Sequence, residues 1–266
     1  MTSDPFVEFK NRQREGWAFF APLEAYTTPP AAQMVRFAGV RPGQTVLDVG
    51  TGTGVVAITA RRGGAVVTGL DLTPELLTRA RENATLADVN DIVWREGDAE
   101  SLPFADGSFD VVLSQFGHMF APRPDVATRE MLRVLKPGSR LAFGTWPPEH
   151  FVGKMFGLIG TYVQAPPGVA SPGEWGDPAV IRDRLGSRVH DIDFERGAMI
   201  FPALSPQHYR DFIEKTAGPV INLVQYLQND RAKLGAFRKE LETLVAQYLV
   251  DNVVRQEYLL TRAIKV

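Results

Sequence analysis

Short apolar runs alternate along the chain with segments whose apolar residues recur every three or four positions. The runs are almost free of polar residues, which is typical of strands buried on both faces of a parallel sheet. The other pattern, illustrated by Leu77, Ala80, Ala84 and Ala87, places apolar side chains along one face of a helix. Strands that alternate with helices predict an α/β fold with a mostly parallel sheet. The strands are expected at 46–49, 66–71, 92–94, 109–115 and 140–146.

The pattern changes near both ends of the chain. An N-terminal helix is expected to end at Gly16, and a second helix is expected to begin at Pro29-Pro30. Toward the C-terminus, partial alternation of apolar and polar residues at 191–201 and 257–266 predicts two further strands. The stretch between them, 202–252, has the length of about two or three ordinary helices.

Composition narrows the class of protein. A chain of 266 residues with 44% hydrophobic content is long enough for one large domain with a substantial core. A net charge of −2 provides no basic field for nucleic acid, and the absence of cysteine excludes disulfides and thiolate metal sites. The chain shows neither a signal-peptide core nor an apolar run of about 18 residues. We therefore expect a cytoplasmic protein without a membrane span.

A glycine-rich turn joins the first expected strand to a helix. Gly50, Gly52 and Gly54 follow the strand at alternate positions, and Asp48 lies inside the strand end. Such a turn brings backbone N–H groups and the positive end of a helix up to a ligand, and glycine leaves room for close approach. Dinucleotide sites use G-x-G-x-x-G, whereas Val55 stands at the third glycine position here.

A second acidic residue, Asp71, ends the second expected strand. In a nucleotide-type site, a carboxylate at this place accepts hydrogen bonds from the ribose hydroxyls. Thr73 followed by Pro74 already supplies a cap for the next helix, so capping does not account for Asp71. We interpret Asp71 as a ribose ligand.

Four sequence motifs together resemble one protein family. VLDVGTGTG, GLDLTPELL, GDAESLPFADGSFDVVLSQ and EMLRVLKPGSRLAF occur in this order between residues 46 and 143. Their order and spacing resemble the ubiquinone/menaquinone-biosynthesis-like group (methyltransferase type 11) of class I S-adenosylmethionine (SAM)-dependent methyltransferases. The chain departs from the group at Thr51, where cysteine is common, and at Ser139, where glycine is usual. Neither change alters the glycines of the turn.

The resemblance implies a fold and a cofactor site. The fold would be a Rossmann-like, seven-stranded, mostly parallel sheet with helices on both faces, and its last two strands would pair antiparallel at the edge. Asp48 would lie near the methionine end of SAM, Asp98 would accept from the exocyclic amine of adenine, and the Ala99 backbone would contact the ring. The expected cofactor-binding residues are Asp48, Gly50, Thr51, Gly52, Gly54, Asp71, Leu72, Asp98, Ala99 and Gln115.

The expected acceptor side lies outside the four motifs. Residues 1–266 are interpreted as a single domain, in which the aromatic-rich N-terminal segment 1–29 forms a lid and 202–252 is a helical insertion over the acceptor site. Trp17, Phe20 and Tyr26 are the lid residues expected to contact a ligand, because their rings offer large apolar surfaces. Packing of the same aromatic residues on the core explains them equally well.

The predicted activity is transfer of a methyl group from SAM to an oxygen, nitrogen or carbon atom of a small-molecule acceptor. His118 is expected just beyond the fourth strand, where it could serve as a general base, and His150 is the second candidate on the acceptor side. A histidine at either place can equally be a packing residue. No acidic cluster with metal-ligand spacing follows the fifth strand, so no metal is expected.

Two alternatives stay open. A nicotinamide-dependent dehydrogenase would share the strand–turn–helix geometry but is disfavoured by Val55 at the third glycine position. A non-catalytic SAM-binding module would share every cofactor residue and differ only in a filled acceptor pocket. A nucleic-acid methyltransferase is disfavoured because Ser114-Gln115-Phe116-Gly117 follows the fourth strand in place of an Asn-Pro-Pro-Tyr-type motif.

Overall fold

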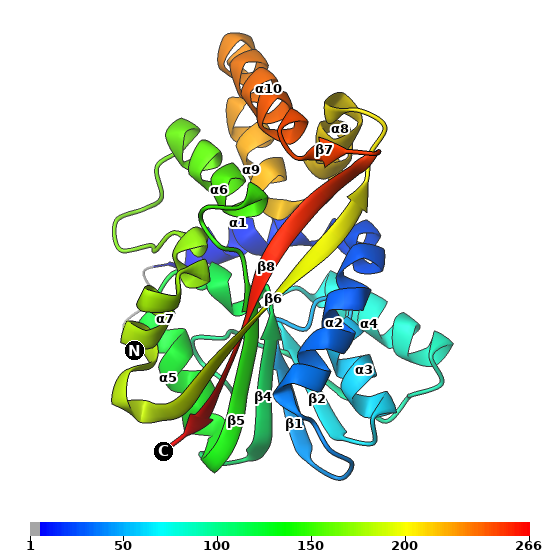
Figure 1. Cartoon of the computed structure of the whole chain (residues 1–266), viewed down its shortest axis with the longest axis vertical. Helices are drawn as coiled ribbons and strands as arrows, with labels where there is room; N and C mark the ends of the chain where they lie inside the picture. The colour runs from blue at the N-terminus through cyan, green and yellow to red at the C-terminus, as the bar shows by residue number, and fades with distance from the viewer. Residues whose placement is uncertain (1–5) are drawn as a thin grey trace.

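The computed structural model of the chain describes residues 6–266 and contains one central sheet (Figure 1). Its strand order is β3-β2-β1-β4-β5-β8-β6; the first five strands run parallel, and β8 pairs antiparallel with β5 and β6. The Rossmann-like expectation is confirmed, and a short extra strand, β7, pairs with β8. The strands are β1 (Thr45–Val49), β2 (Val66–Asp71), β3 (Val93–Glu96), β4 (Phe109–Gln115), β5 (Leu135–Thr145), β6 (Val189–Pro202), β7 (Leu249–Val250) and β8 (Val253–Lys265).

Helices cover both faces of the sheet. In Figure 1, α2, α3 and α4 lie on one side of the sheet, and α5 and α7 lie on the other. The helices are α1 (Val7–Trp17), α2 (Glu24–Ala38), α3 (Val55–Arg62), α4 (Pro74–Leu86), α5 (Pro124–Val134), α6 (Phe151–Tyr162), α7 (Pro178–Leu185), α8 (Pro206–Thr216), α9 (Gly218–Leu227) and α10 (Arg231–Ala246). None of the helices in the described part of the chain is long and apolar enough to cross a membrane.

The central strands β1 and β4 form the middle of the core. Val46, Leu47 and Val49 of β1 and Val111 and Leu113 of β4 are fully buried. Because helices cover both faces, these strands contain consecutive apolar residues rather than an alternating pattern. The parallel strands end together at one edge of the sheet, so polar residues that follow β1, β2 and β4 meet there.

A second layer of helices lies beyond that edge. The strands β6 and β8 extend past the parallel strands, and α6, α8, α9 and α10 gather around their far end (Figure 1). We call these four helices, together with β7, the helical cap. Aromatic side chains join the cap to β6: the ring of Tyr209 packs 4.8 Å from Phe201 and 5.4 Å from Phe151, measured between centroids.

Two expectations about the N-terminal helices are wrong. The helix α1 continues through Gly16 to Trp17. A Cβ at Gly16 would lie 2.8 Å from Asn222 Oδ1 of α9, so glycine at this position allows α1 and α9 to pack closely. The helix α2 begins at Glu24, so Pro29-Pro30 lies inside it and not at its start. Each proline removes one N–H donor from α2, but packing of the buried face of α2 against the core keeps these residues helical. The predicted lid begins at residue 1, and its first five residues lie outside the described part of the chain.

Candidate functional site

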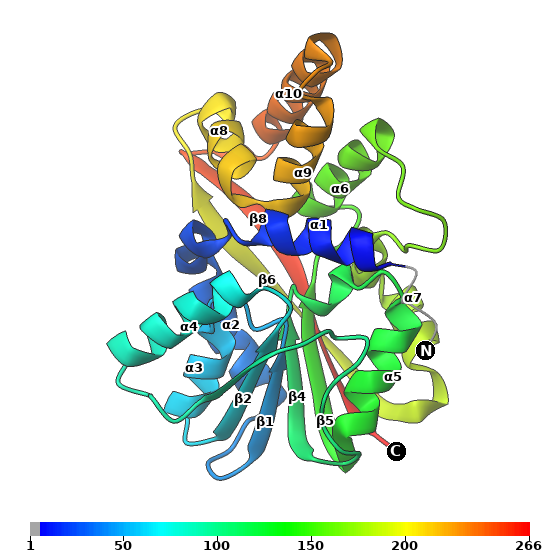
Figure 2. The same ribbon diagram turned by 180° about the vertical axis from the view of Figure 1, so that it is seen from behind.

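A cavity opens where β1, β2 and β4 end and continues into the helical cap. Its lower walls are the turns that follow these strands, and its upper walls come from α6, α8 and α9. The helix α1 crosses over the ends of the parallel strands, beneath the cap (Figure 2). The cavity therefore lies between three parts of the chain that are distant in sequence.

The glycine turn after β1 is held by close backbone packing. Gly50, Gly52 and Gly54 have φ angles of 67°, 54° and 83°, in the left-handed region that favours glycine. A Cβ at Gly50 would lie 2.9 Å from the Cα of Gly117, so the turn after β1 touches the turn after β4. Gly117 was not among the predicted site residues, although its place after a buried strand was a signal for it.

The backbone N–H groups of this turn are already used within the protein. Thr51 N donates to Leu70 O at 2.9 Å, and Gly52 N donates to Asp71 Oδ2 at 2.7 Å. Gly54 N donates to Thr51 O at 2.9 Å. These three N–H groups therefore hold the turn together, and the turn offers the cavity a surface with few side chains.

Asp48 has one carboxylate oxygen without a partner. Its Oδ2 accepts from the Thr51 hydroxyl at 2.6 Å and from Ala57 N at 3.1 Å. Its Oδ1 is buried and accepts no hydrogen bond from any residue in the described part of the chain. Burial, assisted by the negative charge of Asp71, raises the pKa of Asp48 to about 7. A cationic ligand group in the cavity would satisfy this oxygen and keep the carboxylate charged.

Asp71 lines the cavity and also fastens the glycine turn to α4. Its Oδ2 accepts from Gly52 N, and its Oδ1 accepts from Thr73 N at 2.9 Å. Burial raises the pKa of Asp71. Thr73 is the N-cap of α4 but makes no side-chain cap bond, so the cap expected of its side chain is wrong. Each Asp71 oxygen keeps a second lone pair for a ligand hydroxyl.

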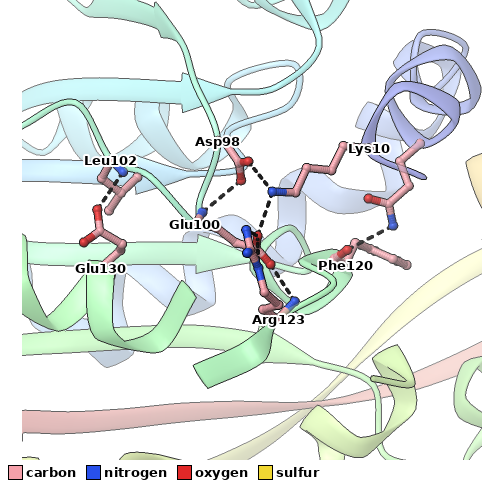
Figure 3. Close-up of polar contacts among 8 residues, drawn as sticks. Lys10, Asp98, Glu100, Leu102, Phe120, Arg123 and Glu130 are labelled. Carbon is pink, nitrogen blue, oxygen red and sulfur yellow. Dashed lines mark hydrogen bonds and ion pairs between the residues drawn. The ribbon is translucent and has the colours of Figure 1, made fainter. Parts of the chain in front are cut away.

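Asp98 belongs to a cluster of charges under α1 (Figure 3). Lys10 Nζ lies 2.6 Å from Asp98 Oδ2 and 2.6 Å from Glu100 Oε2. Arg123 donates to Glu100 through its backbone N and its guanidinium. Asp98 Oδ1 accepts from Glu100 N at 2.9 Å. Asp98 and Ala99 both line the cavity, as does Lys10, which sequence reasoning missed.

Only some of the predicted lid residues line the cavity. Trp17 and Phe20 line the cavity, and the ring of Trp17 packs 4.8 Å from that of Phe120 in an edge arrangement. Gln13 on α1 donates to Phe120 O at 2.9 Å, which adds a polar contact between α1 and the turn after β4. Tyr26 does not line the cavity; its ring stacks on Phe201 with a centroid distance of 4.3 Å.

Gln115 and His150 occupy different environments. Gln115 lines the cavity, donates to Thr27 O at 2.8 Å and leaves its Oε1 buried without a donor from the described residues. His150 precedes α6 and does not line the cavity. Its Nδ1 lies 2.9 Å from Glu257 Oε2. The structure thus places Gln115, but not His150, beside the expected site.

His118 follows β4 as expected, but its ring is surrounded by apolar side chains. The ring centroid lies 4.8 Å from that of Phe143 and 4.6 Å from that of Trp175, and neither of these residues lines the cavity. Both ring nitrogens are buried without a partner among the described residues. Burial, reinforced by the positive charge of Arg184, lowers the pKa of His118 to about 3. The general-base role stays a prediction that this packing does not support.

His118→Leu is expected to remove an acid sensitivity of the fold. The unfolded chain takes up a proton near pH 6.5, whereas the buried ring does so only near pH 3, so the contribution of His118 to stability falls as the pH drops between these values. Relative to the wild type, the variant should gain about 2 kcal/mol between pH 8 and pH 5. Urea unfolding at both pH values measures the difference, with exposed His190→Leu as the control. Equal pH dependence in the wild type and His118→Leu would contradict the prediction.

The upper half of the cavity is apolar apart from one polar pair. Trp146, Met155 and Met199 are among its walls, together with Tyr209 of α8 and Gln256 of β8. Gln256 Nε2 donates to the Tyr209 hydroxyl at 3.0 Å, and both residues are buried. Sequence reasoning assigned the region 202–252 to this side but identified neither residue of the pair.

Comparison with known proteins agrees with this arrangement. A family model described as a methyltransferase domain matches residues 47–143. The chain is 36% identical over 258 residues to the uncharacterized protein Rv1403c of Mycobacterium tuberculosis, covering 95% of this chain and 93% of that one. It is 42% identical over 111 residues to the ubiquinone/menaquinone biosynthesis C-methyltransferase UbiE of Roseobacter denitrificans, covering 41% of this chain and 44% of UbiE.

A solved structure shares the fold. Phosphoethanolamine N-methyltransferase 2 of Haemonchus contortus, in complex with SAM, superposes with a TM-score of 0.57 and 20% identity, covering 89% of this chain and 52% of that one. The strand order and this structure agree on the fold, and the family model and the similarity to UbiE agree on the family. The chain belongs to the class I SAM-dependent methyltransferases, in the group that is similar to the ubiquinone/menaquinone-biosynthesis enzymes, and SAM is its cofactor.

Proposed function

We propose that the protein transfers the methyl group of SAM to a small-molecule acceptor, at an oxygen, nitrogen or carbon atom. The observation that carries this proposal is the single cavity that extends from the glycine turn into the helical cap. A methyltransferase needs its donor and its acceptor in one enclosed space, because transfer requires the reacting atoms to be aligned and in contact. The cavity is partly covered by α1 (Figure 2) and is lined by the cap, which suits a small acceptor better than a polymer.

The lower half of the cavity has the chemistry to hold SAM. The unpartnered Asp48 Oδ1 suits the ammonium group of the methionine end, and the remaining lone pairs of Asp71 suit the ribose hydroxyls. Gly52 leaves space that a Cβ would fill, and Asp98 with Ala99 suits adenine. The remaining proposed cofactor contacts, which line the same half, are Gly50, Thr51, Leu72 and Gln115. Gly54 does not line the cavity and instead supports the turn against Trp94.

The chain contributes chiefly position and exclusion of water. When bound, SAM supplies a methyl group that is already activated by its positive sulfur. Trp17 and Phe20 cover the cavity from the N-terminal side, and the cap covers it from above, so an acceptor between them is shielded from solvent. We therefore assign the lid role to the segment within 1–29 that lines the cavity, and the acceptor-binding role to the insertion 202–252, which forms most of the cap.

Within residues 6–266, no ionisable side chain that lines the acceptor half is suited to proton removal at neutral pH. Among the described residues that line it, Tyr209 is the titratable one, and burial raises its pKa well above the usual range. Tyr209 is thus a neutral hydrogen-bonding group. This composition favours an acceptor whose nucleophilic atom needs no protein base, or whose proton passes to water.

Label transfer from SAM tests the proposed function. The protein is incubated with methyl-labelled SAM and a complete cell extract, and the label is followed in the metabolite, protein and nucleic-acid fractions. We expect label in the metabolite fraction, suppressed by excess S-adenosylhomocysteine, because that product binds the same half of the cavity. Label confined to protein or nucleic acid would contradict the small-molecule assignment. SAM binding without any transfer would favour a non-catalytic module.

A further inference from the structure

The acceptor half of the cavity differs chemically from the cofactor half. The charged or titratable residues that line the cavity in the described part of the chain are Lys10, Asp48, Asp71, Asp98, His118 and Tyr209. The first five come from α1, from the ends of β1 and β2, or from the segments after β3 and β4, which form the cofactor half. Tyr209 alone comes from the cap, so no formal charge faces the acceptor half.

Apolar side chains from several elements form the rest of this half. They come from the end of β5, from α6, from β6 and from α8 and α9. Such walls stabilise an apolar ligand by removing its surface from water. They cannot pair with a charged group, which would lose its hydration on entering the cavity without gaining a partner there. The walls therefore select against ionised acceptors such as free amines or phosphate esters.

The polar pair in these walls has unused hydrogen-bonding capacity. The Tyr209 oxygen accepts from Gln256 Nε2, but the Tyr209 O–H donates to no residue in the described part of the chain. Gln256 Oε1 likewise accepts from none of those residues. A ligand in the cavity can therefore form hydrogen bonds with both groups. The pair offers one donor and one acceptor side by side.

We propose that the methyl acceptor is an uncharged, mainly apolar molecule and that Tyr209 and Gln256 together bind its hydroxyl, carbonyl or similar polar group. This inference rests on the proposed function, because it concerns the acceptor of that reaction. The pair acts as a specificity determinant: the apolar walls accept the body of the molecule, and the pair fixes where its polar group lies. Tyr209 lies on α8 of the cap, and Gln256 lies near the start of β8, whose first residues pair with β7, so this contact is on the side of the cavity away from the glycine turn.

Two probes of similar shape separate the apolar contribution from the polar one. 2-Naphthol carries one hydroxyl on an apolar body, and 2-methylnaphthalene replaces that hydroxyl with a methyl group. Binding of each is measured by calorimetric titration of the full chain saturated with S-adenosylhomocysteine. We expect the wild type to prefer 2-naphthol by about fivefold, the effect of one ordinary hydrogen bond. Phosphoethanolamine should not displace 2-naphthol from the wild type.

Tyr209→Phe is the test variant and Tyr248→Phe is its control. Both rings pack against Phe151, with centroid distances of 5.4 Å and 5.3 Å, but only Tyr209 lines the cavity. The ring of residue 209 is retained, so the variant should fold and bind S-adenosylhomocysteine as the wild type does. We expect Tyr209→Phe to show a smaller preference for 2-naphthol, because Gln256 is retained, and Tyr248→Phe to keep the fivefold preference.

Three results would overturn the inference. They are preferential binding of phosphoethanolamine, failure of both naphthalenes to bind, and an unchanged preference for 2-naphthol in Tyr209→Phe. Each is read on protein that binds S-adenosylhomocysteine, so each leaves the methyltransferase proposal intact. Conversely, a wild-type protein that does not bind S-adenosylhomocysteine would count against the proposed function. Naphthalene titrations of the protein without S-adenosylhomocysteine would still report on the acceptor half.

Discussion

Replacing Lys10 with methionine is expected to lower the free energy of unfolding by about 3 kcal/mol. The Lys10 side chain is 8% exposed and the Glu100 side chain is 1% exposed, so their 2.6 Å ion pair is shielded from water. Removing one partner of a buried pair leaves the other charge without compensation, which costs about 3–5 kcal/mol. We expect the lower end of that range, because Glu100 keeps Arg123 and the Asp98 side chain is 27% exposed.

Methionine keeps most of the length and the apolar stem of the lysine, so the lowered free energy of unfolding of Lys10→Met reports mainly on the lost charge. Arg14→Met on the same helix is the matched control. Arg14 pairs with Glu96 at 3.1 Å, but the two side chains are 39% and 51% exposed, and an ion pair of this kind contributes about 0–1 kcal/mol. Urea unfolding of both variants measures the contrast. Similar losses in the two variants would contradict a special role for the buried cluster.

The Lys10→Met variant also tests whether the buried charge cluster holds α1 over the cavity. Lys10 joins α1 to Asp98, the residue proposed to bind adenine, so its loss should loosen the helix as well as lower stability. We expect faster proteolytic cleavage within Val7–Trp17 and weaker binding of S-adenosylhomocysteine in Lys10→Met. Arg14→Met should match the wild type in both measurements. A stability loss without any change in cleavage would limit the cluster to a packing role.

The parts of the site that could be predicted from sequence are local. Asp48, Gly50 and Gly52 lie within one strand–turn–helix unit, and the geometry of that unit follows from the apolar strand and the glycines. Asp71 was predictable because parallel neighbouring strands end at the same edge of the sheet. In each case a short stretch of chain determines where the side chain lies.

Contacts between distant segments could not be predicted in this way. Lys10 and Glu100 are separated by 90 positions, and neither residue has a local pattern that indicates the other. His118 illustrates a different limit: its place after β4 follows from the sequence, but its ring direction depends on packing against Trp175 of a later segment. Tyr26 is similar, since Phe201 and not a ligand covers its ring.

Gly52→Ala is expected to weaken SAM binding by about 10- to 100-fold, an effect of 1–3 kcal/mol from overfilling a packed site. A Cβ at Gly52 would contact no protein atom more closely than Phe20 Cε1, at 4.0 Å. Phe20 lines the cavity, so the added methyl group would occupy space on the ligand side and not inside the core. The variant should therefore fold, with a cost of about 1 kcal/mol for an alanine at a φ of 54°.

Gly43→Ala separates backbone strain from obstruction of the site. Gly43 has a φ of 79°, and a Cβ there would meet nothing within 4 Å, so alanine incurs a similar strain in a turn that does not line the cavity. Both variants should lose about 1 kcal/mol of stability, whereas only Gly52→Ala should lose SAM affinity. Calorimetric titration with SAM and urea unfolding measure the two quantities on the same samples. If Gly52→Ala bound SAM as tightly as Gly43→Ala, the space beside Gly52 would not belong to the cofactor, and the placement of SAM along this turn would have to be abandoned.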